Sequence, residues 1–274
     1  MTARHRDGKL ETLILTICNQ KGGTGKTTTT FHLARAAVLA GLRVLLIDMD
    51  PQGNLSKIAA RSRVETQQLG VADVLTEDSE YELREVIVEG RWEGIYLAPT
   101  SGRGLMNLRN ELVAANIGRE LRLRKALEDL RGEYDLIFID CPPSVDQLTI
   151  NGLVACDEAI VVTESTLFGA DGLGQLGQTI EDVQEYFHPD LRIRGVVVNK
   201  HEAREVSASD FMARLQKWGP VLEPAIPLRV CIKDSSQSGM GLDEWTGDRK
   251  SPQMAALYNE LLPAVIGERN VAPA

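Results

Sequence analysis

Short apolar runs rich in Val, Ile and Leu alternate along the chain with longer stretches in which apolar residues recur at helical spacing. Six of these runs are nearly continuous in apolar residues, as strands covered on both faces must be. They span residues 13–18, 44–48, 95–98, 136–140, 159–163 and 195–199. Helical spacing predicts helices over about residues 27–40, 119–130 and 172–187, and an apolar stripe predicts another over 255–263.

The alternation of strands and helices predicts the fold class. We expect an α/β fold with an open, mostly parallel, twisted sheet and helices on both faces. No linker rich in Pro, Gly or Ser divides the chain. We therefore predict a short extension over residues 1–10, a single domain over residues 11–266 and a tail over residues 267–274.

Composition narrows the class of protein. Of 274 residues, 43% are hydrophobic and 25% are charged, which excludes a disordered or collagen-like chain. No apolar run reaches the roughly 18 residues that span a bilayer. The N-terminal residues lack the apolar core of a signal peptide. The four cysteines are scattered without a CxxC pair, so we expect a reduced, cytoplasmic protein.

A glycine-rich segment lies between the first predicted strand and the first predicted helix. Residues 19–28 read NQKGGTGKTT. Its glycines permit positive φ and let backbone N–H groups turn inward around an anion, beside the positive end of the helix. Lys26 would reach the β- and γ-phosphates of a nucleotide, and the Thr27 hydroxyl would ligate Mg²⁺. The residues expected to hold the phosphates are Gly22, Gly23, Thr24, Gly25, Lys26, Thr27 and Thr28.

This segment departs from two familiar patterns. The standard P-loop requires Gly five residues before Gly25, where this chain has Gln20. A dinucleotide-binding turn fits in part, because Asp48 ends the second strand where a ribose-binding acid would stand. That turn needs GxGxxG, however, and its third Gly is replaced by Thr28. It also gives no purpose to Lys26, so the sequence favours a site for nucleotide phosphates.

With Lys21 at its first position, KGGTGKT resembles the deviant Walker A motif of the ParA/MinD ATPases. Other segments match this family in order over about residues 10–265. Residues 48–54 (DMDPQGN) are similar to the DxDPQGN segment of ParA-type partition proteins, and residues 135–144 (DLIFIDCPPS) are similar to their Walker B strand. The resemblance implies a P-loop NTPase fold, an ATPase activity, and ATP and Mg²⁺ as cofactors.

The resemblance also implies catalytic and metal-binding roles. Lys21 would cross a dimer interface to contact the phosphates bound by the partner subunit, while Lys26 would contact those of its own subunit. Asp50 would orient the attacking water. Asp48 would support the shell of the Mg²⁺ ion that Thr27 ligates, and Asp140 would hold a metal-bound water. Each aspartate also suits an ordinary helix cap or turn, so that alternative stays open.

Two further segments fall where the family recognises adenine. They are residues 198–200 (VNK) and 225–227 (AIP). Asn199 would hydrogen-bond N6 and N7 of the base with its amide, and Pro227 would pack on the ring. A residue of either type is also common in turns, so both roles remain open.

Charge is distributed unevenly along the chain. The formal net charge is −9, but residues 192–233 carry eight Lys or Arg and four Asp or Glu. Arg229 and Lys233 lie where related partition ATPases carry DNA-contacting residues, and Arg204, Arg214 and Lys217 would extend the track. Phosphate contacts are short-ranged at cellular salt, so such a patch can bind DNA despite the net charge. An ordinary solvated surface of mixed charge is the alternative.

Other features limit how DNA is bound and which relatives fit. The patch lacks aromatic residues that stack on bases, so we expect binding to the duplex backbone without sequence preference. About ten residues precede the first strand, which leaves no room for a helix-turn-helix domain.

Residues 255–262 contain no Lys or Arg, which disfavours a MinD-like helix that binds membranes. A ligase similar to dethiobiotin synthetase would need a second substrate pocket, which no group of residues marks.

The sequence therefore predicts a Mg–ATP-dependent ATPase that forms a homodimer when ATP is bound. It would bind double-stranded DNA on the nucleoid non-specifically and make no contact with a membrane. A ParB-like centromere-binding adaptor would stimulate hydrolysis. The cycle would segregate or position a plasmid, a chromosome or another cargo, because hydrolysis removes the ATP that holds the dimer together.

Overall fold

The computed structural model describes residues 11–165, 173–201, 215–216 and 218–267. The predicted extension over residues 1–10 lies outside the described residues, as does the tail from residue 268.

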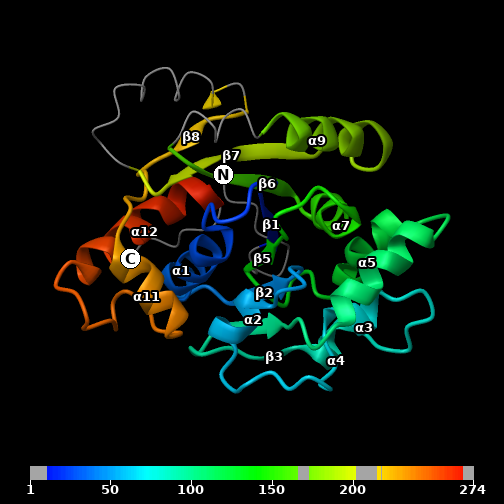
Figure 1. Cartoon of the computed structure of the whole chain (residues 1–274), viewed down its shortest axis with the longest axis horizontal. Helices are drawn as coiled ribbons and strands as arrows, with labels where there is room; N and C mark the ends of the chain where they lie inside the picture. The colour runs from blue at the N-terminus through cyan, green and yellow to red at the C-terminus, as the bar shows by residue number, and fades with distance from the viewer. Residues whose placement is uncertain (1–10, 166–172, 202–214, 217, 268–274) are drawn as a thin grey trace.

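The described strands form one eight-stranded sheet in the order β3-β4-β2-β5-β1-β6-β7-β8 (Figure 1). The strands are β1 (Leu13–Cys18), β2 (Val44–Asp48), β3 (Val88–Glu89), β4 (Ile95–Ala98), β5 (Leu136–Asp140), β6 (Glu158–Glu164), β7 (Arg192–Asn199) and β8 (Val221–Leu222). The pairing of β3 with β4 is antiparallel, and the other neighbouring pairs are parallel. The prediction of a mostly parallel open sheet is confirmed.

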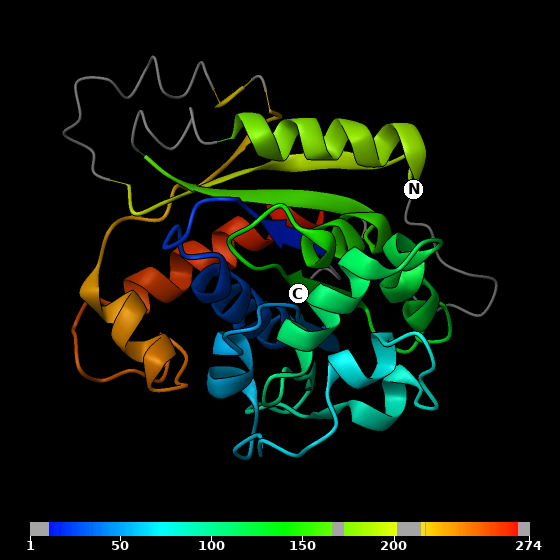
Figure 2. The same cartoon turned by 45° about the vertical axis from the view of Figure 1, so that its right-hand side comes forward.

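Helices cover both faces of this sheet (Figures 1 and 2). The α-helices are α1 (Lys26–Leu39), α2 (Asn54–Ala59), α3 (Val71–Leu75), α4 (Leu83–Val86), α5 (Gly104–Ala114), α6 (Arg122–Glu128), α7 (Gln147–Ala155), α9 (Gly174–Tyr186), α11 (Val230–Gln237) and α12 (Ser251–Ile266). A 3₁₀ turn, η1 (Arg119–Leu121), precedes α6. One core packs α1, α2, α11 and α12 on one face, and the other core packs α3 to α7 and α9 on the opposite face.

Strand β5 shows why the apolar runs are continuous. Leu136 and Phe138 belong to the core on the α1 side, whereas Ile137 and Ile139 belong to the core on the other side. Successive side chains of a strand point to opposite faces, so a strand covered on both faces needs apolar residues throughout. The Val, Ile and Leu content of the predicted strands follows from this two-sided burial.

The helix predictions are confirmed in part. Helix α1 ends before Gly41, which has φ 82° as a helix-terminating glycine should. The helix predicted over residues 119–130 is instead a 3₁₀ turn followed by the shorter α6. Helix α12 extends beyond the predicted 255–263 at both ends and continues past Pro263. Burial of Val265 and Ile266 offsets the backbone hydrogen bond that the proline removes. None of the described helices has the length and low polarity needed to cross a bilayer.

Candidate nucleotide site

The sheet brings the predicted phosphate loop and two aspartates to one edge. Parallel pairing of β2 with β5 sets Asp48 opposite Asp140, and pairing of β1 with β5 sets Ile17 opposite Asp140. All three positions lie at the carboxyl ends of their strands. Ligands of open α/β sheets bind beyond these ends, so the sheet register alone defines a candidate site.

The loop between β1 and α1 depends on glycine at two positions. Gly23 has φ 81° and Gly25 has φ 89°, values that other L-residues rarely adopt. Gly25 also precedes the first residue of α1, and a Cβ atom at this position would overlap the side-chain amide of Asn199. The loop therefore brings its backbone close to β7 and directs the N-terminus of α1 toward the candidate site.

Lys26, the first residue of α1, is buried beneath this loop. Its exposed fraction is 6%, and its Nζ donates a hydrogen bond to the carbonyl oxygen of Lys21 at 3.3 Å. Burial lowers the pKa of Lys26, while the nearby carboxylate of Asp140 opposes that shift. A buried ammonium at a helix N-terminus is a strong attractant for phosphate oxygens.

Asp140 and the threonines of α1 form a cluster of oxygen atoms. Thr27 Oγ1 donates to Asp140 Oδ2 at 2.7 Å, and Thr30 Oγ1 lies 3.4 Å from Asp140 Oδ1. Asp140 is fully buried. Burial raises the pKa of Asp140, and the neighbouring charge of Asp48 adds to the shift. A bound cation would therefore stabilise the ionised form of the Asp140 carboxylate.

Asp48 is held by the start of α2. Its Oδ2 accepts hydrogen bonds from the backbone N–H and the hydroxyl of Ser56, both at 2.7 Å, and its Oδ1 accepts from Asp50 N at 3.2 Å. Burial raises the pKa of Asp48 to about 6. Asp50 is 7% exposed, and its carboxylate accepts a hydrogen bond from Gln52 N. The turn after β2 thus fixes both aspartates relative to Asp140.

These groups fit a Mg²⁺ ion. A threonine hydroxyl and carboxylates are hard oxygen donors of the kind that Mg²⁺ selects. Thr27 and Asp140 already lie within one hydrogen bond of each other. Because Ser56 occupies one oxygen of Asp48, that residue suits support of the metal shell better than direct ligation.

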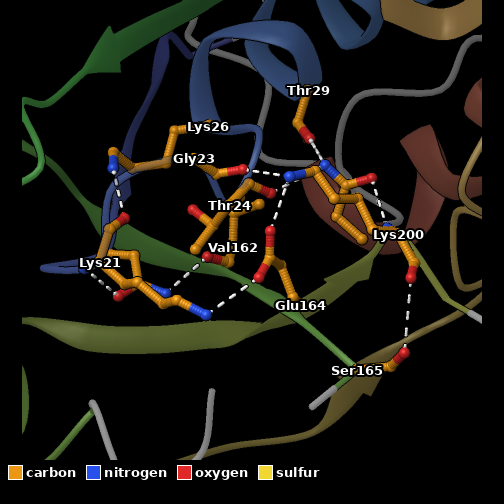
Figure 3. A network of polar contacts seen from close by, with 11 residues as sticks. Lys21, Gly23, Thr24, Lys26, Thr29, Val162, Glu164, Ser165 and Lys200 are labelled. Carbon is orange, nitrogen blue, oxygen red and sulfur yellow. Dashed lines mark hydrogen bonds and ion pairs between the residues drawn. The ribbon is translucent and has the colours of Figure 1, made fainter. Parts of the chain in front are cut away.

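Lys21 directs its ammonium group away from Lys26 and toward Glu164, the last residue of β6 (Figure 3). The Lys21 Nζ lies 3.0 Å from Glu164 Oε2, and the Lys200 Nζ lies 2.6 Å from Glu164 Oε1. Lys200 also donates to the carbonyl oxygen of Gly23 at 2.5 Å. Burial alone would raise the pKa of Glu164, but the hydrogen bonds and charges of the two lysines outweigh it and lower that pKa.

Asn199 and Pro227 lie on adjacent segments, as the predicted adenine site requires, because Ile226 N donates to Val198 O at 2.8 Å. The Asn199 amide already has partners within the chain. Its Nδ2 donates to Thr24 O at 3.0 Å, and its Oδ1 accepts from Lys200 N at 2.9 Å. A contact between Asn199 and adenine would therefore have to replace these bonds, and the bond to Thr24 also ties β7 to the phosphate loop.

The residues predicted to contact DNA are described only in part. Arg229 is the extended residue just before α11 and Lys233 lies in the first turn of that helix, and both are exposed. Leu228 and Val230 beside them are 47% and 71% exposed. Arg204, Arg214 and Lys217 lie outside the described residues.

Four residues of the site were given no role of their own from the sequence. They are Ser56, Thr100, Glu164 and Lys200. Glu164 ends β6, which lies next to β1 in the sheet, and Lys200 follows β7, which lies next to β6, so knowledge of the strand order would have indicated them. Ser56 and Thr100 act behind Asp48, where the Thr100 hydroxyl donates to the Asp48 carbonyl at 2.7 Å. No sequence pattern marks such supporting residues.

Comparisons with known proteins agree with this geometry. Residues 12–193 match the family described as an AAA domain. The chain is 35% identical over 228 residues to the sporulation initiation inhibitor protein Soj of Bacillus subtilis, covering 82% of this chain and 88% of Soj. It is 37% identical over 231 residues to the chromosome partitioning protein ParA of Caulobacter vibrioides, covering 82% and 84% of the two chains.

Solved structures share the fold. The structure of cobyrinic acid a,c-diamide synthase from Mycobacterium smegmatis, with bound ATP analog and magnesium, superposes with a TM-score of 0.75 at 32% identity, covering 93% of this chain and 94% of that one. The septum site-determining protein MinD of Pyrococcus horikoshii has a TM-score of 0.74 at 24% identity and covers 93% and 96%. Together with the loop carrying Lys21 and Lys26, these matches show that the chain belongs to the ParA-type family of P-loop partition ATPases.

Proposed function

We propose that this chain is a Mg–ATP-driven dimer that binds double-stranded DNA non-specifically and releases it after hydrolysis. The proposal assigns Lys26, Thr27 and the loop glycines to the phosphates of ATP, and Asp48 and Asp140 to the environment of Mg²⁺. A ParB-like adaptor on a plasmid, chromosome or other cargo would stimulate turnover. The protein would act in the cytoplasm, on the nucleoid.

One observation carries the proposal: the two lysines of the loop face different surroundings. Lys26 is buried at the N-terminus of α1, whereas the side chain of Lys21 is 40% exposed and pairs with Glu164. Its own subunit therefore has one buried cation for the phosphates and a second cation at the surface. A surface cation of this kind suits phosphates presented by a second subunit, where it would stabilise charge that develops during transfer.

The residues of the chain suggest how the reaction proceeds. Bound Mg²⁺ would neutralise charge on the phosphates. Lys26 and the loop N–H groups would hold the transferred phosphate, and Asp50, next to the buried Asp48, would orient the attacking water. Because Ser56 and Gln52 fix these two carboxylates, little reorganisation is needed when the water is positioned.

A sedimentation experiment tests the proposal. Purified protein is mixed with duplex DNA or with anionic liposomes, each with Mg–ATP and with Mg–ADP. We expect retention by DNA that requires ATP, no retention for Lys26→Ala, and prolonged retention for Asp50→Ala. Equal retention with ATP and ADP would contradict the switch, and capture by liposomes would favour a MinD-like membrane role.

A small-molecule enzyme is the second candidate function. It is favoured by one observation, which is the 32% identity of this chain to the cobyrinic acid a,c-diamide synthase from Mycobacterium smegmatis. Such an enzyme would consume ATP without capture by DNA or liposomes. Retention by neither, together with unchanged hydrolysis when DNA and an adaptor are added, would support this candidate over the partition cycle.

A further inference from the structure

A second cavity lies beside the nucleotide site, at the carboxyl ends of β2 and β4. It has a volume of about 550 Å³ and is formed by the turn after β2, helix α2 with the segment that follows it, and the loop after β4. This volume lies within the range of about 300–1,000 Å³ that is usual for small-molecule sites. The predicted roles of the nucleotide site do not use this cavity.

The lining of the cavity is strongly basic. Lys57, Arg61, Arg63 and Arg91 contribute to it, and none of the described lining residues is acidic. The formal net charge of the chain is −9, so four cations around one concavity run against the overall composition. Cations in a hollow focus the electrostatic potential and attract anions more strongly than the same cations spread over a flat surface.

Three of these side chains are held in place. Lys57 Nζ donates to Gln52 O at 2.6 Å, Arg91 Nε donates to Ile58 O at 2.6 Å, and Arg61 pairs with Glu89, which lies outside the lining. For Arg63 the described part of the chain offers no acidic partner within 4.0 Å. Side chains that are already ordered lose little conformational entropy when a ligand binds.

The cavity is also connected to Asp48 of the nucleotide site. Ser56 and Thr100 contribute to its lining, and both make hydrogen bonds with Asp48. Thr100 N also donates to the hydroxyl of Ser56 at 2.8 Å. A ligand in the cavity would contact the residues that position Asp48. It can therefore alter the Mg²⁺ and nucleotide site without touching the nucleotide.

We propose that this cavity binds a small phosphate-bearing molecule and that its occupancy alters ATP turnover through Ser56 and Thr100. Arginine guanidinium groups and hydroxyls together are the donors that phosphate oxygens select. The phosphates of a DNA backbone have the same chemistry. A hollow in which the cations converge suits a compact ligand better than a duplex, whose backbone needs an extended surface. The binding part of this proposal does not depend on the proposed partition cycle, and only the effect on turnover does.

Calorimetry tests the binding. The full chain is first saturated with Mg–ADP, so that the nucleotide site is filled, and inorganic tripolyphosphate is then titrated in excess Mg²⁺. We expect one further site per chain, weakened at least tenfold in Arg63→Gln and in Arg91→Gln. Arg124→Gln is the matched control, because Arg124 is exposed on α6, outside the cavity, and the charge change is the same. Absence of a second site, or equal weakening in all three variants, overturns the proposal.

Two further measurements test whether the cavity affects ATP hydrolysis and whether its phosphate ligand is a small molecule or the DNA backbone. Wild-type ATP hydrolysis should change at least twofold when tripolyphosphate is added, whereas Arg63→Gln should keep the basal rate and lose the response. Retention of duplex DNA is measured for the same variants. A defect of Arg63→Gln in DNA retention with unchanged tripolyphosphate binding would overturn the proposal in favour of a DNA contact.

Discussion

Glu164 is the residue that holds Lys21 within its own subunit. The same carboxylate also binds Lys200, so one half-buried acid pairs with two lysines beside the phosphate loop. If Lys21 contacts the phosphates of a partner subunit, as proposed, it must first leave Glu164. The ion pair is partly exposed and is worth at most about 1 kcal/mol.

Glu164→Gln should therefore favour the dimer. Removing the carboxylate charge frees Lys21 in both subunits, so we expect the Mg–ATP-dependent dimer to form up to about 25-fold more readily, or about fivefold for each of the two ion pairs released. Sedimentation velocity over a range of protein concentrations measures the change. Glu158→Gln is the control, because Glu158 lies at the other end of β6 and pairs with Arg194. A weaker dimer in Glu164→Gln would mean that the carboxylate supports Lys21 in the bound state.

Gly23 and Gly25 allow a matched test of the loop. Both have positive φ, but a Cβ atom at Gly23 would meet no heavy atom within 4 Å, whereas one at Gly25 would overlap the Asn199 amide. Gly23→Ala should carry only the backbone strain of about 1–2 kcal/mol. Gly25→Ala should weaken Mg–ATP binding at least tenfold more than Gly23→Ala, measured by calorimetry. Equal affinities would show that Asn199 moves aside freely.

The sequence best predicted the residues whose positions in the site depend only on their neighbours along the chain. Lys26 and Thr27 follow a glycine loop, and their position at the start of α1 is a local property of the sequence. Glu164 and Lys200 meet the loop only because β6 lies beside β1 and β7 lies beside β6 in the sheet. Glu164 lies 143 residues from Lys21 and 36 residues from Lys200 in the sequence. A single sequence carries no signal that such distant residues pair.

At the scale of elements, helix α1 joins the phosphate loop to the C-terminal helices. Its His32 is 2% exposed, and the ring Nε2 lies 3.2 Å from the carbonyl oxygen of Ile232 in α11. The centre of the ring also lies 5.0 Å from that of the Tyr258 ring, tilted by 42°. Tyr258 belongs to α12, and helix α12 packs along α1 (Figure 2). Burial lowers the pKa of His32 to about 4, and the charge of Asp243 only partly opposes this shift.

This buried histidine makes the packing of α1 sensitive to acid. In the unfolded chain the pKa of His32 returns to about 6.5, so the unfolded state binds a proton that the folded state excludes. The resulting contribution to stability is present above pH 6.5 and is lost as the pH falls toward 4, by about 3 kcal/mol in all. His32→Gln keeps a donor for Ile232 but does not titrate. Urea unfolding at pH 7 and pH 5 should show a smaller acid loss in the variant, and equal losses would contradict the assignment.

Elements differ in how far the sequence predicts them. The six longer strands are buried on both faces, and their apolar runs indicate them directly. Strands β3 and β8 have two residues each, which is too short for any periodicity, and the sheet places them at its edges. Helix α12 continues past Pro263 because Val265 and Ile266 bury beyond it, and that gain depends on contacts with a distant part of the chain.

At the scale of the whole molecule, a net charge of −9 opposes DNA binding, and only a local patch can overcome it. Arg229 and Lys233 are exposed at the start of α11, on the face of the sheet covered by α1 and α12. Charges farther away than about 10 Å are largely screened at cellular salt. The position of these two cations should therefore matter more than the total charge.

Charge reversal tests position against total charge. We expect Arg229→Glu with Lys233→Glu to lower Mg–ATP-dependent retention of duplex DNA at least tenfold and to reduce the slope of log affinity against log salt by about two. Dimer formation should persist. Arg124→Glu with Lys125→Glu makes the same charge change on α6, on the opposite face of the sheet, and should leave retention nearly unchanged. Both double variants change the net charge by the same amount. A similar loss of DNA retention in the two would therefore assign the effect to net charge and contradict a specific role for Arg229 and Lys233. No loss in either would mean that DNA is held by other cations of the chain.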